Sequence, residues 1–359
     1  VLNFKVHPIL KEIAELALPI TLKFNTDKEV LNSPVQISYE DLAKEFDAVF
    51  IALHGRPGED GVLQRNLIKY NIPFNGSGPE SSEITINKYR TTEILRQNGF
   101  LVADAKMIFK SNWLSNKNSI ISEIETNFKY PIIAKPSDDG CSSAVKKINN
   151  NEQLIAFAEL MFRNSEQRDS ELEKILNLDS NEEFPQKEYF MVESFIQSNG
   201  AAHFLEITGG MLTQMDAQGN RVYEIFEPSE ALANNGILSL AEKFLAGEGQ
   251  NITPARFDKN PQLSAQISSL VKIELEKAAK VLNIEGYCRI DAFVRIFSPS
   301  KIEVIFIEVN SLPGMTPATC IFHQAAINGY KPLDFIDKIL NYGFLRTQNL
   351  VHNNEKLSN

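Results

Sequence analysis

Short apolar runs alternate with helical periodicity along the first third of the chain. Residues 47–53 form an apolar run that leads into a glycine-rich loop at residues 54–61, a pattern typical of a buried strand that feeds a loop. Residues 62–70 and 87–98 have the periodicity of helices, and a brief strand and turn is predicted between them at 71–78. Strand, loop, helix and strand in this order indicate an α/β domain.

The pattern changes near residue 105, where a second group of elements begins. Residues 130–136 and 189–196 predict strands, and residues 151–162 predict a helix that begins near Asn151. Residues 164–188 are rich in Glu, Asp, Ser and Asn, which favours a solvated helix or a mobile insertion.

The C-terminal third of the chain alternates turns, strands and helices. Residues 207–251 mix Gly-Gly and Gly-Asn turns with short strands, and residues 262–282 predict a long amphipathic helix. Two strands are expected near 288–296 and 302–309, and a final helix at roughly 332–340.

These elements predict an α/β fold with three subdomains, because 359 residues are too many for one ordinary core. We expect an N-terminal subdomain at residues 1–104, a central one at 105–206, a C-terminal one at 207–345 and a polar tail at 346–359. Before residue 47 only a helix near 7–17 and a strand near 20–24 are predicted, so the N-terminal subdomain is expected to be incomplete.

Composition narrows the class of protein. Hydrophobic residues make up 43% and charged residues 23%, as in ordinary globular proteins, and no apolar run approaches the roughly 20 residues that span a bilayer. The net charge of −10 argues against nucleic acid as a main partner. The three cysteines lack the spacing of a metal site, and no basic-then-apolar leader is found at the start. We therefore expect a cytoplasmic protein with reduced thiols and no membrane partner.

Two carboxylates and an amide lie at the ends of the last two predicted strands. Asp291 shares one strand with Arg289, and Glu308 and Asn310 close the next. Glu308 and Asn310 are two residues apart, so their side chains share a face of the strand that Asp291 can complete. Oxygen ligands suit Mg²⁺ (or Mn²⁺) on ATP phosphates, and Arg289 can stabilise an anionic intermediate. From these residues alone, ordinary acidic strand ends are the more frequent explanation.

Five ordered landmarks within residues 47–340 resemble the D-alanine–D-alanine ligases, a family of ATP-grasp carboxylate–amine ligases. They are His54-Gly-Arg-Pro-Gly-Glu-Asp-Gly61, Asn75-Gly-Ser-Gly78, Asn87-Lys-Tyr-Arg-Thr91, the strand from Tyr130-Pro131 to Lys135-Pro136-Ser137, and Gly286–Asp291 with Phe306–Thr316. Five landmarks in the family's order are far more specific than any one of them. The resemblance implies an ATP-grasp fold, in which an N-terminal α/β subdomain precedes two subdomains that hold ATP between them.

The resemblance implies contacts to ATP for five residues, those of the flap through backbone N–H groups. Lys88 and Lys135 would contact the phosphates, and Glu193 would hold adenine and ribose. Ser142 belongs to a small flap that folds over the phosphates, and Lys243 matches a lysine that closes over the γ-phosphate. The alternatives are a surface carboxylate for Glu193 and a solvated loop lysine for Lys243.

Three further positions match the family's substrate groups. His54 would belong to the first substrate's subsite, and Thr319 falls where the family holds the second substrate's carboxylate. The backbone N–H of Gly314 would contact the reacting carbonyl oxygen. In the flap, Asp138 and Asp139 are unfavourable near phosphates unless they point outward.

The chain departs from the family pattern at three places. No segment before residue 47 resembles the family's first strand and the glutamate that binds the first substrate's amino group. Cys141 and Phe244 replace a serine and a tyrosine that form a polar pair in the family, where phenylalanine at the tyrosine position is associated with hydroxy acids such as D-lactate as the second substrate. Cys141 itself is expected to be a small buried residue. The ribose-binding glutamate is replaced near His203.

The resemblance implies a ligase that joins two D-alanines through an acyl phosphate, with ATP and two Mg²⁺ ions, for peptidoglycan precursor synthesis. A D-alanine–D-lactate ligase, or another carboxylate–amine ligase of the same fold, is the near alternative. A nucleotide-binding domain without catalysis is the alternative from another class. The expected partners are small molecules, and the family's frequent dimers suggest a homodimer.

Overall fold

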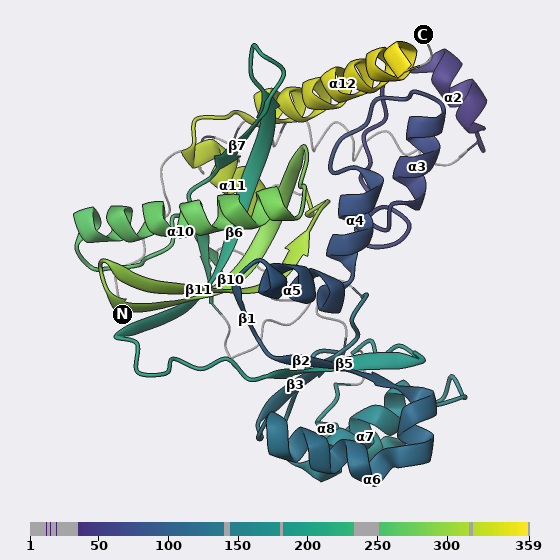
Figure 1. The fold of residues 1–359 in the computed structure, drawn as a ribbon, viewed down its shortest axis with the longest axis vertical. Helices are drawn as coiled ribbons and strands as arrows, with labels where there is room; N and C mark the ends of the chain where they lie inside the picture. The colour runs from purple at the N-terminus through teal and green to yellow at the C-terminus, as the bar shows by residue number, and fades with distance from the viewer. Residues whose placement is uncertain are drawn as a thin grey trace.

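The protein, as a computed structural model, is described at residues 35–139, 144–179, 182–232, 251–315 and 319–357, as well as Glu12, Glu15 and Pro19. Two β-sheets lie one above the other along the long axis of the molecule, each with helices of its own (Figure 1). The expected α/β class is therefore confirmed. Of the helix expected near 7–17, these residues include Glu12 and Glu15, and both are helical; the strand expected near 20–24 lies outside them.

The larger sheet is antiparallel except at one edge. Within the described residues its strand order is β1-β11-β10-β6-β8-β9, with β7 paired to β6. The strands are β1 (Leu101–Val102), β6 (His203–Met215), β7 (Arg221–Ile225), β8 (Ser229–Ala231), β9 (Asn251–Ile252), β10 (Tyr287–Ser298) and β11 (Lys301–Asn310). Only β1 runs parallel to its neighbour, β11. The two strands predicted near 288–296 and 302–309 are confirmed as β10 and β11.

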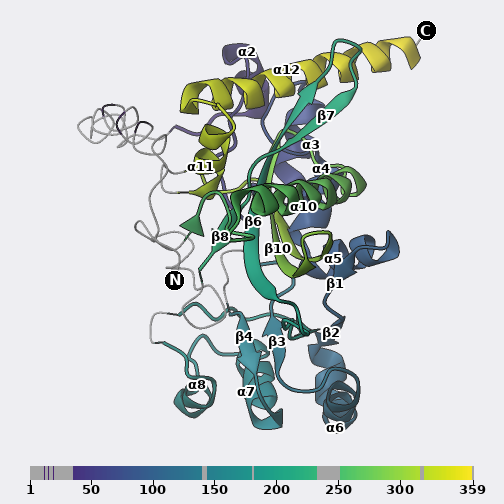
Figure 2. The same ribbon diagram turned by 90° about the vertical axis from the view of Figure 1, so that its left-hand side faces the viewer.

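Residues along β10 alternate between a face that packs into the core and a face that carries candidate site residues. Its buried residues Cys288, Ile290, Ala292, Val294 and Ile296 join one core cluster with Ile267, Val271 and Leu275 of α10 (Pro261–Val281). This helix, predicted at 262–282, lies along the sheet (Figures 1 and 2). Because neighbouring strand residues point to opposite faces, Arg289, Asp291 and Phe293 are directed away from α10.

The smaller sheet has the strand order β2-β5-β3-β4 and carries three helices on one side (Figures 1 and 2). The strands are β2 (Ala105–Phe109), β3 (Ile132–Lys135), β4 (Lys146–Ile148) and β5 (Tyr189–Ser194), and the helices are α6 (Lys110–Asn127), α7 (Asn151–Met161) and α8 (Ser170–Leu176). The strands expected at 130–136 and 189–196 and the helix at 151–162 are confirmed; Asn150, not Asn151, caps that helix by accepting a hydrogen bond from the Gln153 N–H.

The acidic segment at 164–188 is not wholly solvated. Its α8 packs against α7, and Leu176 and Phe184 are buried in the core of the smaller sheet. Leu172, Ile175 and Leu178 pack against the same core, so a short apolar face within this otherwise polar stretch docks it.

Between residue 35 and the smaller sheet the chain forms four helices: α2 (Tyr39–Glu45), α3 (Val62–Lys69), α4 (Pro79–Ile86) and α5 (Lys88–Gln97). The helices expected at 62–70 and 87–98 are confirmed. The strand expected at 47–53 is reduced to an isolated bridge between Val49 and Phe74. The reason is that a side chain takes the place of a strand partner, since the Asn75 amide accepts from the Ile51 N–H at 2.6 Å and donates to the Ile51 carbonyl at 3.2 Å.

The Gly209-Gly210 pair, expected in a turn, lies inside β6 instead. A Cβ at Gly209 would overlap the Leu275 side chain of α10, and one at Gly210 would overlap Gln324 of α11 (Cys320–Ile327). The glycines therefore let two helices pack closely on opposite faces of the strand. The Gly219-Asn220 turn is confirmed between β6 and β7, where Gly219 has a φ of +81°.

The last helix is much longer than expected. α12 runs from Pro332 to Leu357, so the predictions of an end near residue 340 and of a polar tail from 346 are wrong. Arg346 explains why the polar continuation stays helical. This side chain is only 6% exposed, and it ties α12 to the segment at 74–76.

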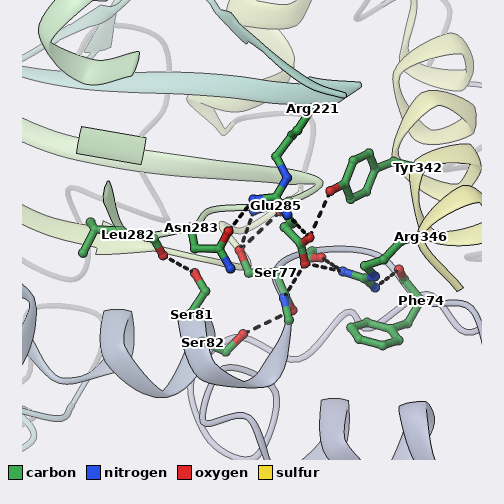
Figure 3. Close-up of polar contacts among 12 residues, drawn as sticks. Phe74, Ser77, Ser81, Ser82, Arg221, Leu282, Asn283, Glu285, Tyr342 and Arg346 are labelled. Carbon is green, nitrogen blue, oxygen red and sulfur yellow. Dashed lines mark hydrogen bonds and ion pairs between the residues drawn. The ribbon is translucent and has the colours of Figure 1, made fainter. Parts of the chain in front are cut away.

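A buried ionic cluster joins the N-terminal helices, the larger sheet and α12 around Glu285 (Figure 3). The Glu285 carboxylate accepts hydrogen bonds from Arg221 Nη2 at 2.5 Å, Tyr342 Oη at 3.1 Å, Arg346 Nη1 at 3.2 Å and the Gly78 N–H at 3.1 Å. Arg346 also donates to two backbone carbonyls, and its guanidinium lies 4.0 Å from the centre of the Phe74 ring.

Replacing Arg346 with methionine is expected to lower the free energy of unfolding by about 1–3 kcal/mol, because it removes one of four donors to the buried Glu285 carboxylate and leaves two buried carbonyls without their donor. Urea unfolding measures this change. Arg90→Met is the matched control, since Arg90 is half exposed, 3.5 Å from Glu83, and surface pairs contribute about 0–1 kcal/mol. Equal losses in both variants would contradict the assignment of Arg346 as the central donor.

Candidate active site

A cavity of about 500 Å³ lies between the two sheets. Its walls come from β3 and β5 of the smaller sheet and from β6, β8, β10 and β11 of the larger one. The lining residues with charged side chains are Lys88, Lys135, Glu193, Glu206, Glu230, Asp291 and Glu308. Five candidate residues that come from separate segments of the sequence therefore line the same cavity. They are Lys88, Lys135, Glu193, Asp291 and Glu308.

One part of the cavity is aromatic and apolar. Phe204 and Phe293 are stacked with ring centroids 5.1 Å apart and an interplanar angle of 19°, and Phe195 and Phe306 also line the wall. Both stacked rings come from neighbouring strands, since Phe204 is paired with Arg295 in the register of β6 with β10. Flat apolar walls beside a few charged groups are the usual form of a small-molecule site, and they suit an aromatic ring system.

Lys135 and Glu193 form a buried ion pair across β3 and β5. The Lys135 Nζ lies 2.6 Å from the Glu193 Oε2, and the residues are 4% and 8% exposed. A lysine this buried is rare without a partner. Both groups are held on rigid strands at the cavity wall, so the alternative of a surface carboxylate for Glu193 is wrong.

Lys88 links the start of α5 to the acidic wall. Asn87 caps the helix by accepting a hydrogen bond from the Arg90 N–H, which places Lys88 at the first helical position. The Lys88 Nζ donates to the Asp139 carbonyl and lies 3.4 Å from the Glu308 Oε2. It is therefore positioned between the flap residues and the candidate metal ligands.

The candidate metal residues face each other across β10 and β11. The strand register pairs Asp291 with Glu308 and Arg289 with Asn310. Directly opposite residues of an antiparallel pair share a face with Cβ atoms about 4.5–5.5 Å apart, so the two carboxylates and the amide converge. Among the described residues no three His, Cys, Asp or Glu side chains come together, so a metal site here depends on the Asn310 amide.

Arg289 binds the same carboxylates. Its Nε and Nη2 each lie 3.0 Å from an oxygen of Asp291, and Nη2 lies 3.8 Å from Glu308 Oε1. Burial would lower the pKa of Arg289, but the two carboxylates outweigh burial and raise it. Arg289 is therefore a permanent, partly buried cation, and it is not among the residues that line the cavity.

The flap residues Asp138 and Asp139 do not line the cavity, and protein groups donate to their carboxylates. Asp138 accepts hydrogen bonds from Arg56 Nη2 at 3.1 Å, Tyr189 Oη at 3.1 Å and Lys187 Nζ at 3.3 Å, and Asp139 accepts from Lys187 at 2.6 Å. Burial would lower the pKa of Lys187, but these carboxylates raise it, so the ammonium stays charged.

A second group of predicted residues lies outside the cavity lining. His54 is part-buried, with its Nδ1 3.1 Å from the Leu312 carbonyl oxygen and 3.1 Å from Glu59 Oε2. Gly314 lies two residues after Leu312, and Thr319 is the N-cap residue of α11. The structure thus brings His54 to the turn that carries Gly314. Ser142, Lys243, Cys141 and Phe244 lie outside the described residues.

Three carboxylates of this region were missed by sequence reasoning. Glu206 and Glu230 line the cavity, and Glu59 is buried beside His54. Glu206 lies three residues after His203. His203 itself is exposed and does not line the cavity, and its Nε2 lies 3.2 Å from the Arg256 carbonyl oxygen. The sequence signal for Glu206 was its position: a charged residue that stands among the apolar residues of β6 and interrupts their pattern. Glu230 is paired with Arg256 at 2.7 Å, a contact that only the fold reveals.

The two described cysteines are free, as expected. Burial raises the pKa of the Cys320 thiol to about 11, so this group is a neutral thiol near Arg289 at neutral pH rather than a nucleophile.

Comparison with known families identifies this architecture. A family model described as the D-ala D-ala ligase C-terminus matches residues 94–176 and 181–341, and the model of the D-ala D-ala ligase N-terminus matches residues 8–77. The chain belongs to the D-alanine–D-alanine ligase family. Residues 8–46, where no landmark was found, fall within the match to the family's N-terminal model, so the N-terminal resemblance begins earlier than residue 47.

Curated members of the D-alanine–D-alanine ligase family are similar over most of the chain. The D-alanine–D-alanine ligase of Azobacteroides pseudotrichonymphae is 31% identical over 304 residues, which cover 84% of this chain and 79% of the relative. That of Leptospira interrogans (strain 56601) is 28% identical over 362 residues, covering 96% and 91%. The chain is therefore a ligase of this family, and the family expectation is confirmed.

Solved structures of the family share the fold. The VanG D-Ala:D-Ser ligase from Enterococcus faecalis has a TM-score of 0.63 at 22% identity, covering 86% of this chain and 79% of its own. A Bacillus anthracis D-alanine–D-alanine ligase complexed with ATP has a TM-score of 0.58 at 22% identity, covering 86% and 83%. These matches confirm the ATP-grasp fold. In the part of the chain that is described, no helix is both long and apolar enough to cross a membrane.

Proposed function

We propose that this chain is an ATP-dependent D-alanine–D-alanine ligase, which activates one D-alanine as an acyl phosphate and joins it to a second for peptidoglycan precursor synthesis. Family membership supports the activity. The observation that carries the proposal for this chain is the single cavity in which Lys88, Lys135 and Glu193 face Asp291 and Glu308.

ATP would bind with its base against the apolar wall and its phosphates toward the carboxylates. Phe204 and Phe293 suit the adenine ring, and Glu193 suits the polar edge of the base or the ribose. Lys88 and Lys135 supply positive charge for the phosphates, and rigid strands hold Lys135 and Glu193 in place. Lys243 and Ser142 stay predictions for the γ-phosphate and the flap.

Asp291, Glu308 and Asn310 would hold Mg²⁺. The residues fit such an ion, because two opposed carboxylates and an amide can supply the oxygen ligands that Mg²⁺ prefers. Bound there, the ion would offset the negative charge of the ATP phosphates. The choice between Mg²⁺ and Mn²⁺, the homodimer and the cytoplasmic location stay predictions.

Around the reacting carbon the chain supplies positioning and positive charge. Arg289, fixed by two hydrogen bonds to Asp291, would stabilise the negative charge that develops when the acceptor amine attacks the acyl carbon. The Gly314 N–H would contact the carbonyl oxygen, with His54 at the first substrate and Thr319 at the second substrate's carboxylate. Subdomains at 1–104, 105–206 and 207–345 would surround these groups.

Phosphate release from Mg-ATP, measured with D-alanine, L-alanine or no amino acid, tests the proposal. Release that requires D-alanine, with D-alanyl-D-alanine as the product by mass spectrometry, is expected. D-lactate or D-serine can also be added in competition with D-alanine. A product that joins D-alanine to one of them would show that this compound is the second substrate in the same reaction. The absence of D-alanine-dependent release from a chain that binds ATP would overturn the proposed activity and favour a nucleotide-binding domain.

A further inference from the structure

Glu59 is a buried carboxylate that connects two loops from opposite ends of the chain. It is 5% exposed, and each of its oxygens serves one loop. Oε2 accepts a hydrogen bond from the Gly55 N–H at 2.7 Å and lies 3.1 Å from His54 Nδ1. Oε1 accepts from the Leu312 N–H at 2.8 Å and from Ser311 Oγ at 3.3 Å. The carboxylate therefore bridges segments more than 250 residues apart.

Both loops carry groups of the proposed reaction. The first contains His54. The second begins directly after Asn310, at the end of β11, and contains Gly314. A shift in the turn at Ser311 and Leu312 would therefore move the candidate metal ligand on one side and the candidate oxyanion N–H on the other. Displacements of about 1 Å are enough to slow an enzyme roughly 10²-fold.

The same contacts specify the tautomer of His54. Its Nδ1 lies 3.1 Å from Glu59 Oε2 and 3.1 Å from the Leu312 carbonyl oxygen, and both are acceptors. Nδ1 must therefore carry the proton that these two acceptors share. Burial would raise the pKa of Glu59, but His54 and the N–H groups of Gly55 and Leu312 lower it below its usual value, so Glu59 is ionised at neutral pH.

We infer that Glu59 is a positioning residue of this ligase, which sets the ring of His54 and the turn that carries Gly314 relative to each other. The inference rests on the proposed function. Glu59 is not a catalytic residue, because both of its oxygens are occupied by protein donors and it does not line the cavity. It acts on the substrates only through His54 and the turn.

The loop has anchors that do not depend on the Glu59 side chain. The Glu59 N–H donates to the Gly55 carbonyl at 2.8 Å, and the Gln64 side chain donates to the Gly58 carbonyl at 2.6 Å. The variant Glu59→Gln should therefore fold. Glutamine has one acceptor oxygen in place of two, so either the Leu312 N–H or the Gly55 N–H loses its acceptor.

The test is a double-mutant cycle of Glu59→Gln and His54→Gln, with Glu80→Gln as the control because Glu80 is exposed on α4. Glu59→Gln should reduce kcat by about 10–100-fold with the KM for ATP within about twofold of wild type. If Glu59 acts through His54, the double variant should be about as slow as the slower single variant. Glu80→Gln should match the wild type in every measurement.

Imidazole ¹⁵N chemical shifts provide a readout independent of activity. The wild-type protein should show a proton on His54 Nδ1, and Glu59→Gln should change the Nδ1 chemical shift because a charged acceptor of that proton is lost. Unchanged kcat in Glu59→Gln, multiplied losses in the double variant, or unchanged His54 chemical shifts would overturn the inference. Failure of the proposed function itself is distinct, because it would appear as a wild-type chain without D-alanine-dependent phosphate release.

Discussion

Replacing Glu308 with glutamine is expected to reduce D-alanine-dependent turnover by about 10³-fold while the protein stays folded. The carboxylate is opposed to Asp291 in the strand register and lies 3.4 Å from Lys88 and 3.8 Å from Arg289. Glutamine keeps the shape of the side chain but removes the charge and one ligand oxygen. The expected loss is therefore in kcat, since the charge that forms during phosphoryl transfer is no longer offset.

The fold should survive this change because Arg289 keeps both hydrogen bonds to Asp291 at 3.0 Å. Phosphate release as a function of Mg²⁺ concentration measures the effect, and the variant should need more Mg²⁺ for its residual activity. Glu152→Gln, an exposed change on α7, is the matched control. Turnover of Glu308→Gln close to that of the wild type would exclude the metal assignment.

Replacing Lys135 with methionine is expected to weaken ATP binding by about 10–100-fold, because a charge-assisted contact to phosphate is worth about 1.5–3 kcal/mol. Lys135 Nζ is buried at the cavity wall and lies 2.6 Å from Glu193. Calorimetric titration with an ATP analogue measures the affinity. Lys338→Met, on an exposed position of α12, should bind ATP as the wild type does.

The same substitution also leaves Glu193 as an unpaired buried charge, which is expected to lower stability by about 3 kcal/mol. The double variant Lys135→Met/Glu193→Gln separates the two effects, since it removes the orphaned charge. It should regain most of the stability but not the ATP affinity. Recovery of both would mean that Lys135 serves the fold and not the nucleotide.

Residues within continuous elements could be predicted from the sequence because their surroundings are set by period and spacing. The alternation along β10 and β11 places Arg289, Asp291, Glu308 and Asn310 on one face, and a two-residue period leaves few other arrangements. The amphipathic pattern likewise predicted α10, and the apolar run ending at Lys135 predicted β3. The resemblance in five ordered segments then indicated which of these residues share a site.

Groups that act across the chain could not be predicted, because long-range contacts leave no periodic signal. The Asn75 amide replaces a strand partner for Ile51, and the Gly209-Gly210 pair serves helix packing instead of a turn. Arg346 was expected in a polar tail, yet it is buried against Glu285. In each case a polar or small residue looks exposed or turn-forming by its own propensity, and its real partner lies far away in sequence.

The sequence by itself determined the α/β class, the family and the carboxylates of the β10–β11 face, since local spacing is enough for all of these. Tertiary structure alone decided that Lys135 and Glu193 share a buried pair, that Glu206 and Glu230 reach the cavity, and that Glu59 holds His54 against the turn after β11. The physical reason is that a hydrogen bond or ion pair depends on distances of about 3 Å, which only the packed chain sets.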